Sequence, residues 1–197
     1  MQVPPARPRT HSIAGSAVEI ELLKASDGDE LGAFVKTLPT HDLLFVRRDV
    51  SHPKVVDAWL AALDGGGITS LAARSDGTLV GCTAIVNDKR SWSRHVAELR
   101  VMVAPAWRGR GLGRVLIQEN FALALGLGLE KLCVQMTTDQ RSAIAVFEGL
   151  GFRAEAVLRA HVKDPDGTAH DLAVLSHHVA DVQSRLQAFG VTEALGD

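Results

Sequence analysis

The feature that most constrains this chain is a turn with three alternating glycines, placed between an apolar segment and a helical pattern. The apolar segment, about residues 95–104, is predicted to be a buried strand that stops at Pro105. A helical pattern begins inside the turn and continues to about residue 125. The glycines are Gly109, Gly111 and Gly113. A strand, a tight turn and a helix therefore follow one another, which indicates a fold that mixes α and β structure.

The glycine turn has the properties of a binding site for a diphosphate. Glycines let successive amide N–H groups point into one hollow, because no Cβ blocks the approach or forbids a positive φ. The start of the helix adds unpaired N–H groups and a partial positive charge. Counter-charge comes from three arginines, Arg108, Arg110 and Arg114. A turn that only begins a helix does not need this charge, so we favour an anion site.

Two common phosphate-binding loops do not fit this pattern. No Lys-Ser or Lys-Thr pair follows Gly113, although the P-loop of nucleotide-binding proteins requires one. The spacing here is G-x-G-x-G, whereas the dinucleotide-binding turn has G-x-G-x-x-G. The turn is therefore expected to bind another class of phosphate ligand.

Composition excludes several other classes of function. The chain has 197 residues and 46% apolar content, which suits one globular domain with a real core. A formal net charge of −2 gives no general attraction to nucleic acid or to an anionic membrane. No run approaches the roughly 20 apolar residues of a membrane span. The scattered histidines lack the spacing of metal ligands, so we expect no metal.

The periodicity of apolar residues and the turn residues predict seven strands and four helices within residues 17–178. Ser51 is expected to be the N-cap of the second helix, with Pro53 in its first turn. The predicted strands are about 17–23, 68–73, 78–86, 95–104, 132–136, 154–162 and 170–177. The predicted helices run from a cap at 26–29 to about 36, then over 51–63, 111–125 and 143–150.

The ends of the chain are predicted to lie outside this domain. Residues 1–16 contain prolines and arginines but no apolar signal-peptide core, so they indicate a flexible lead-in and, by default, a cytoplasmic protein. Residues 179–197 are predicted to form a final helix, to about 189, and a short tail. That helix either caps the core or forms the contact of a homodimer. Cys82 and Cys133 lie in apolar runs, which favours buried free thiols over a disulfide.

Two motifs in the correct order resemble the GNAT superfamily of acyl-coenzyme A-dependent N-acyltransferases. Arg108, Gly111 and Gly113 match the family pattern Arg/Gln-x-x-Gly-x-Gly. Residues 143–152, Ala-Ile-Ala-Val-Phe-Glu-Gly-Leu-Gly-Phe, look like the family's helix that ends in Leu-Gly-Phe. The resemblance implies an α/β fold of the mixed α+β kind. Its central mixed, mostly antiparallel sheet has about six to seven strands and is flanked by helices on both faces.

The resemblance, which covers about residues 17–178, also implies the coenzyme and its binding residues. In the family the fourth and fifth strands splay apart, and the pantetheine arm of acetyl-CoA lies between them. Backbone groups of the fourth strand then pair with that arm, and one amide polarises the thioester carbonyl. The family's usual Asn early in the next helix corresponds to Gln140. The implied coenzyme-binding residues are Val101, Met102, Val103, Arg108, Gly109, Arg110, Gly111, Leu112, Gly113, Arg114 and Gln140.

The implied reaction needs a base, because an ammonium group must lose its proton before it can attack the thioester. Glu98 is the candidate catalytic residue, since several family members place a glutamate at this point of the fourth strand. The alternative is structural: Glu98 pairs with Arg100 or Arg94, or faces the solvent. The residues alone leave both interpretations open.

Two positions depart from the family pattern. Phe147 stands where many members have a tyrosine that is proposed to protonate the leaving thiolate, and Gln135 stands where other members have a glutamate. Three explanations are open. The thiolate leaves unprotonated; water or Cys133 supplies the proton; or the protein binds the coenzyme with little catalysis.

The acceptor is the least constrained part of the prediction. The hairpin that contains His170 and Asp171 resembles the phosphinothricin-acetyltransferase-like branch, which acylates the α-amine of amino-acid-like molecules. We therefore expect acetyl transfer to a primary amine of a small, amino-acid-like molecule. A protein N-terminus or lysine as acceptor is one alternative, and a non-catalytic acyl-CoA sensor is another. For His170 and Asp171, a polar pair that stabilises the hairpin is the simpler explanation.

Overall fold

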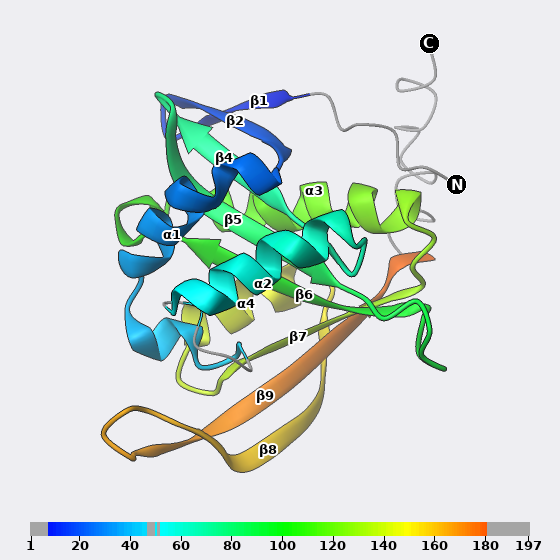
Figure 1. The fold of residues 1–197 in the computed structure, drawn as a ribbon. Helices are drawn as coiled ribbons and strands as arrows, with labels where there is room; N and C mark the ends of the chain where they lie inside the picture. The colour runs from blue at the N-terminus through cyan, green and yellow to red at the C-terminus, as the bar shows by residue number, and fades with distance from the viewer. Residues whose placement is uncertain (1–7, 47–49, 51, 181–197) are drawn as a thin grey trace.

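The computed structural model describes residues 8–46, 50 and 52–180, which form one sheet with helices on both faces (Figure 1). None of the helices in this part of the chain is long and apolar enough to cross a membrane. The strands are β1 Arg9–Ile13, β2 Ser16–Leu22, β3 Ile68–Thr69, β4 Leu71–Ser75, β5 Thr78–Val86, β6 Val96–Val103, β7 Lys131–Thr137, β8 Arg153–Lys163 and β9 Ala169–His178. The α-helices are α1 Gly28–Lys36, α2 Pro53–Asp64, α3 Leu112–Gly126 and α4 Arg141–Gly149. Three short 3-10 helices are η1 Ala25–Asp27, η2 Thr40–Leu43 and η3 Pro105–Trp107.

The sheet has the order β1-β2-β4-β5-β6-β7-β9-β8, and β3 pairs with β5. Among the described strands, β6 and β7 form the only parallel pair; all other neighbours are antiparallel. The parallel pair is short, because Val96–Glu98 face Lys131–Cys133 and no pairing follows. Both strands continue beyond this point, so the sheet divides near its centre.

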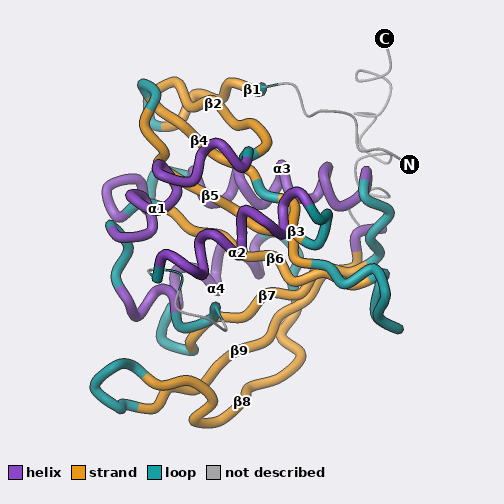
Figure 2. The backbone as a smooth tube through the Cα atoms, viewed as in Figure 1, coloured by secondary structure: helices purple, strands orange, loops and turns teal. Residues whose placement is uncertain are grey.

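The two faces of the sheet carry separate hydrophobic clusters. Helices α3 and α4 cover one face, where Phe121 and Phe147 belong to the larger cluster (Figures 1 and 2). Helices α1 and α2 cover the other face, where Phe34 and Trp59 belong to the second cluster. Both clusters draw on β6: Leu99 packs into the first and Met102 into the second. The divided part of the sheet therefore lies between two packed layers.

A buried polar contact fixes helix α3 on the sheet. The side chains of Asn120 in α3 and Thr83 in β5 are both fully buried. Asn120 donates from Nδ2 to Thr83 Oγ1 at 3.0 Å and to the carbonyl of Leu116 at 2.7 Å. Because buried polar groups that lose their partners are costly, this pairing favours one rotation of α3 about its axis. It thereby holds the start of the helix in place after the glycine turn.

Most predicted elements are present, and three differences stand out. The lead-in predicted for residues 1–16 is wrong in its second half, because β1 pairs with β2 along Arg9–Ile13. The single strand predicted over residues 68–73 is divided into β3 and β4, and this division together with β1 gives the sheet nine strands and not six or seven. Helix α2 has His52 as its N-cap, where the ring accepts the amide of Lys54; Ser51 lies outside the described residues. Residues 181–189 of the predicted final helix also lie outside them.

The two cysteines differ more than the sequence suggested. Cys82 is fully buried, and burial raises the pKa of its thiol to about 12. Cys133 in β7 is only partly buried, so the prediction of a buried thiol is wrong at this position. Both thiols are free.

Arg74 on β4 joins the second helical layer to the sheet. Its guanidinium contacts Glu21 at 2.8 Å, Asp27 at 3.2 Å and Glu30 at 2.6 Å. Burial raises the pKa of Asp27, but the Lys24 amide and the Arg74 guanidinium more than offset this, so its pKa lies below the ordinary value. The carboxyl of Asp27 therefore favours the folded state when it is ionised.

We expect the substitution Arg74→Gln to lower the free energy of unfolding by about 1–3 kcal/mol at pH 7, because it leaves three partly buried carboxylates without their cation. Urea unfolding followed by circular dichroism measures this. Lys24→Gln removes only an exposed ion pair with Glu21 and is the control, with an effect within about 0.5 kcal/mol.

The wild type and Arg74→Gln also test the contribution of Asp27 to stability. Its contribution is present above the unfolded pKa, about 3.9, and is lost as the pH falls through the lower folded pKa. The difference in stability between the wild type and Arg74→Gln should therefore narrow below about pH 4. A constant difference between pH 7 and pH 2.5 would contradict this account.

Candidate active site

The separation of β6 from β7 creates the candidate site. In an antiparallel strand, alternate residues direct their N–H and C=O groups to opposite neighbours. The amide of Ala104 donates to the carbonyl of Val80 at 2.9 Å, on the β5 side. The carbonyl of His95 accepts from the amide of Glu130 at 2.8 Å, on the β7 side. Odd-numbered residues of β6 therefore direct their backbone groups towards β7, and even-numbered residues direct them towards β5.

This alternation separates the three residues predicted to contact a pantetheine arm. Val101 and Val103 direct their N–H and C=O groups into the fork, where β7 no longer pairs with them. Met102 pairs with Cys82 of β5, and its side chain is buried in the cluster under α1 and α2. The backbone groups and the side chain of Met102 both face away from the fork, so this geometry favours Val101 and Val103 as the contacts.

The fork holds a small cavity of about 40 Å³. Its walls are mainly apolar and come from β6, β7, α4 and the segment after η2. Gln140 is the N-cap of α4, and Phe147 lies about two turns further along the same helix. The lining residues are Phe45, Leu99, Val101, Val134, Gln135, Met136, Gln140, Ala143 and Phe147. Phe45 was missed, because its short apolar run carries no motif.

The glycine turn follows directly from the end of β6. Gly109 and Gly111 have φ of +69° and +93°, and a Cβ built on either would meet no atom within 4 Å. Gly111 is the N-cap of α3, and no side chain caps that helix. The first amides of α3 are therefore uncapped, and open space lies beside the glycines, where the sequence predicts the phosphate-binding hollow. The side chain of Leu112 is fully buried in the core, so only its backbone is available to a ligand.

The three arginines of the turn already have partners within the protein. Arg108 donates from Nε to the carbonyl of Val103 at 3.2 Å, and its Nη2 lies 2.7 Å from Asp42 Oδ2. Arg110 lies over the ring of Trp107, 5.6 Å from its centre. Arg114 donates to the carbonyl of Gly149 at 3.5 Å, a long contact. All three side chains are exposed, so their charge still contributes to the potential of the hollow.

Glu98 lies at the point where the strands separate, and Cys133 is its partner across the parallel pair. Both of its carboxylate oxygens accept from Arg100, Oε1 from Nε at 2.8 Å and Oε2 from Nη2 at 3.1 Å. Arg100 and Glu98 are both partly buried, with side-chain exposures of 14% and 17%. The ion pair with Arg100 agrees with the structural interpretation of Glu98. Its position beside the fork agrees with the catalytic interpretation, so both stay open.

Cys133 was one possible donor of a proton to a leaving thiolate. Burial raises the pKa of its thiol, and the nearby Glu155 and Glu98 carboxylates raise it further against the opposing effect of Lys131. A free thiol has a pKa near roughly 8.5. Proton transfer from Cys133 to another thiolate is therefore unfavourable, which leaves water as the simpler donor.

His170 and Asp171 make contacts that stabilise the β8–β9 hairpin. The Asp171 carboxylate accepts the amide of Ala160 at 2.8 Å, next to a register shift in β8. Ala160 has a φ of +47°, so this contact supports a strained backbone. His170 contacts Asp164 at the end of the same hairpin. The simpler explanation of this pair, hairpin stabilisation, agrees with these contacts.

A larger hollow of about 620 Å³ lies elsewhere. It is lined by residues such as Leu22, Leu63 and Lys89, and it touches α3 at Gly126, the end opposite to the glycine turn. The 15 residues of α3 place these ends about 22 Å apart. The hollow therefore cannot receive a ligand part held between the turn and the fork.

Comparison with known proteins agrees with this geometry. Residues 36–152 match the family described as "Acetyltransferase (GNAT) family". The chain belongs to the GNAT family. Solved GNAT structures also share its fold. An acetyltransferase of the GNAT family from Streptococcus pneumoniae has a TM-score of 0.71 at 22% identity and covers 82% of this chain and 99% of its own. A phosphinothricin acetyltransferase from Sinorhizobium meliloti, solved with AcCoA, has a TM-score of 0.71 at 18% identity, with coverages of 82% and 88%.

Curated relatives are similar over a part of their length. N-alpha-acetyltransferase RimI of Mycobacterium tuberculosis is 31% identical over 102 residues, which is 52% of this chain and 63% of that protein. L-amino acid N-acetyltransferase AaaT of Escherichia coli is 30% identical over 93 residues, 47% and 57% of the two chains. This GNAT chain therefore spans less than two thirds of either relative.

Replacement of Gly111 by Val should weaken binding of coenzyme A at least tenfold. A valine there strains the backbone at φ +93° and puts a branched side chain into the open hollow. Isothermal titration calorimetry with coenzyme A measures the affinity. Gly126→Ala is the control, because it lies at the far end of α3 with free space at its Cβ, and it should bind like the wild type. Equal affinity of Gly111→Val and the wild type would remove the turn from the binding site.

Proposed function

We propose that this protein is an N-acetyltransferase that transfers the acetyl group of acetyl-CoA to a primary amine of a small, amino-acid-like molecule. The observation that carries this proposal is the continuity of the fork with the glycine turn. On β6, the backbone groups of Val101 and Val103 face the fork, and the glycine turn begins a few residues later. One extended coenzyme can therefore be held at its pyrophosphate by the turn and along its arm by the strand.

The protein's backbone supplies the electrostatic part of the reaction. An amide of Val101 or Val103 directed into the fork can donate to the thioester oxygen, where negative charge develops when the amine attacks. Fixed backbone donors are effective because they need no reorganisation during the step. The apolar wall of Leu99, Val134 and Phe147 lowers the local dielectric and strengthens that donation. The carbon–sulfur bond then breaks, and the thiolate leaves.

Glu98 is the proposed acceptor of the ammonium proton. Its carboxylate lies on β6, two residues before Arg100 and at the apex of the fork. The pair with Arg100 fixes the direction of the carboxylate, and the partial exposure of both groups leaves room for a water molecule to relay the proton. Phe147 cannot return a proton to the thiolate, so we propose that solvent protonates it after release.

Acetylation of a protein and coenzyme sensing, the two alternative functions, are each supported by specific observations. Acetylation of a protein N-terminus is supported by similarity to the N-alpha-acetyltransferase RimI of Mycobacterium tuberculosis. A coenzyme-binding sensor is supported by the engagement of both Glu98 oxygens and by Phe147 and Gln135 in the cavity wall. Small amines remain the favoured acceptors, because L-amino acid and phosphinothricin acetyltransferases are among the similar proteins.

The activity is tested by release of free thiol from acetyl-CoA in the presence of amino acids, polyamines, other small amines and peptides. We expect turnover with at least one amino-acid-like acceptor, with a higher kcat/KM than for any peptide. Mass spectrometry of the product should show one added acetyl group on nitrogen. Turnover only with peptides would support the second function. Tight binding of acetyl-CoA with no turnover by any acceptor would support the sensor.

The substitution Glu98→Gln tests the base. General base catalysis contributes on the order of 10²–10⁴-fold, so kcat/KM for the amine should fall by at least about a hundredfold. The acidic limb of the pH–rate profile should also disappear, while coenzyme affinity stays close to the wild-type value. Glu19→Gln, an exposed position on β2, is the matched control and should keep the full rate. An unchanged rate and pH profile in Glu98→Gln would eliminate Glu98 as the base.

A further inference from the structure

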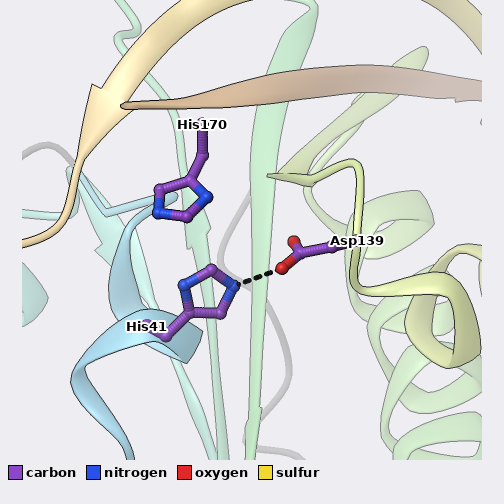
Figure 3. A group of neighbouring side chains, drawn as sticks. All are labelled: His41, Asp139 and His170. Carbon is purple, nitrogen blue, oxygen red and sulfur yellow. Dashed lines mark ion pairs between the residues drawn. The ribbon is translucent and has the colours of Figure 1, made fainter. Parts of the chain in front are cut away.

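A group of histidine and carboxylate side chains lies outside the fork and has no role in the proposed transfer. His41 comes from η2, Asp139 from the turn before α4, and His170 from β9 (Figure 3). One potential ligand atom from each of the three lies within 4.8 Å of the others. Asp164, in the turn between β8 and β9, completes the group. Three distant segments of the chain thus bring their side chains to one point.

Asp164 contacts one nitrogen of each imidazole ring, which we call the outer nitrogen; the other is the inner nitrogen. Its Oδ2 lies 3.4 Å from Nδ1 of His41 and 2.5 Å from Nε2 of His170. The remaining nitrogen of each ring is on the side of Asp139, and Nε2 of His41 is 2.9 Å from Asp139 Oδ2 (Figure 3). When the outer nitrogens donate to Asp164, the inner nitrogens present lone pairs. A carboxylate that orients ligand histidines in this way is a common feature of metal sites.

The donor set matches a particular class of ion. Two imidazole nitrogens and one carboxylate suit zinc and similar divalent transition metals, whereas calcium and magnesium prefer oxygen ligands alone. Ligand atoms around a tetrahedral zinc with bonds near 2.0 Å lie about 3.3 Å apart. The separations here, from 2.9 Å to at most 4.8 Å, differ from that value by no more than small side-chain rotations. A fourth position would be left for water.

The surroundings allow an ion to enter. The side chains of His41 and His170 are 31% and 20% exposed, and that of Asp139 is 60% exposed. Thr137 Oγ1 lies 3.3 Å from Nε2 of His41 and adds a neutral oxygen beside the inner nitrogens. No cationic side chain of the described residues forms an ion pair with Asp139 or Asp164 other than these histidines.

We propose that His41, Asp139 and His170 form a binding site for a divalent transition-metal ion of the zinc type, in which Asp164 orients both imidazoles. This inference is opposed to the sequence-based expectation of no metal, and it does not depend on the proposed acetyl transfer. The site would connect η2, the start of α4 and the β8–β9 hairpin. Because Asp139 precedes Gln140, and Phe45 follows η2 closely, a bound ion would stiffen one rim of the fork.

The test is calorimetric titration of the full chain, freed of metal by a chelator, with Zn²⁺. We expect one equivalent bound with a Kd in the micromolar range or below. His41→Gln and His170→Gln should each weaken binding at least tenfold, and Asp139→Asn, at an exposed position where misfolding is not expected, should do the same. Asp164→Asn should weaken Zn²⁺ binding by about 10- to 100-fold, because Asp164 orients both histidines without binding the ion itself.

His161→Gln is the matched control, because His161 is exposed on the same hairpin and lies outside the group. It should bind Zn²⁺ like the wild type. Circular dichroism shows whether each variant is folded. The proposal is overturned if the wild type does not bind Zn²⁺ at millimolar concentration. It is also overturned if folded Asp139→Asn, His41→Gln and His170→Gln all bind Zn²⁺ like the control.

Discussion

The structure depends on an unmet requirement of backbone hydrogen bonding at the centre of its sheet. Backbone N–H and C=O groups in a buried strand need partners, and a neighbouring strand normally provides them. Here β7 pairs with only the first three residues of β6 and then moves away. Val101 and Val103 consequently face a gap between two packed layers. The Arg108 side chain donates to the Val103 carbonyl there, and an extended ligand can take the place of the missing strand along the rest. On the proposed function, binding of the coenzyme would complete the sheet.

Several contacts fix the elements that surround this gap. The Asn120–Thr83 pair holds α3 against β5, and Arg74 holds the opposite helical layer against β4. Arg108 joins the glycine turn to Asp42 in η2, across the mouth of the fork. These contacts come from both faces of the sheet, so they fix the layers between which the gap lies.

The local parts of this arrangement are predictable from sequence. Gly109 and Gly111 adopt positive φ as their residue type allows. The apolar periodicity predicts α4 itself, but Phe147 is buried whereas Val146 of the same predicted face is exposed. Strand β1 was missed, because polar residues of its exposed edge resemble those of a loose terminus. The set of His41, Asp139 and His170 was missed for another reason: only the tertiary fold brings such distant positions together. For Glu98, the sequence left a catalytic and a structural interpretation open, and only the folded chain shows its contact with Arg100.

The stacking of Arg110 on Trp107 has a consequence for spectroscopy. The chain has three tryptophans and no tyrosine, so its intrinsic ultraviolet emission comes from indole alone. Trp59 is a buried residue of α2 and Trp92 is almost fully exposed, and neither lies at the glycine turn. Trp107 is the indole within the turn, and a cation rests on its ring. An anion that draws the guanidinium away would change the electric field at that ring. The emission of Trp107 would then change, so this residue can report anion binding at the turn.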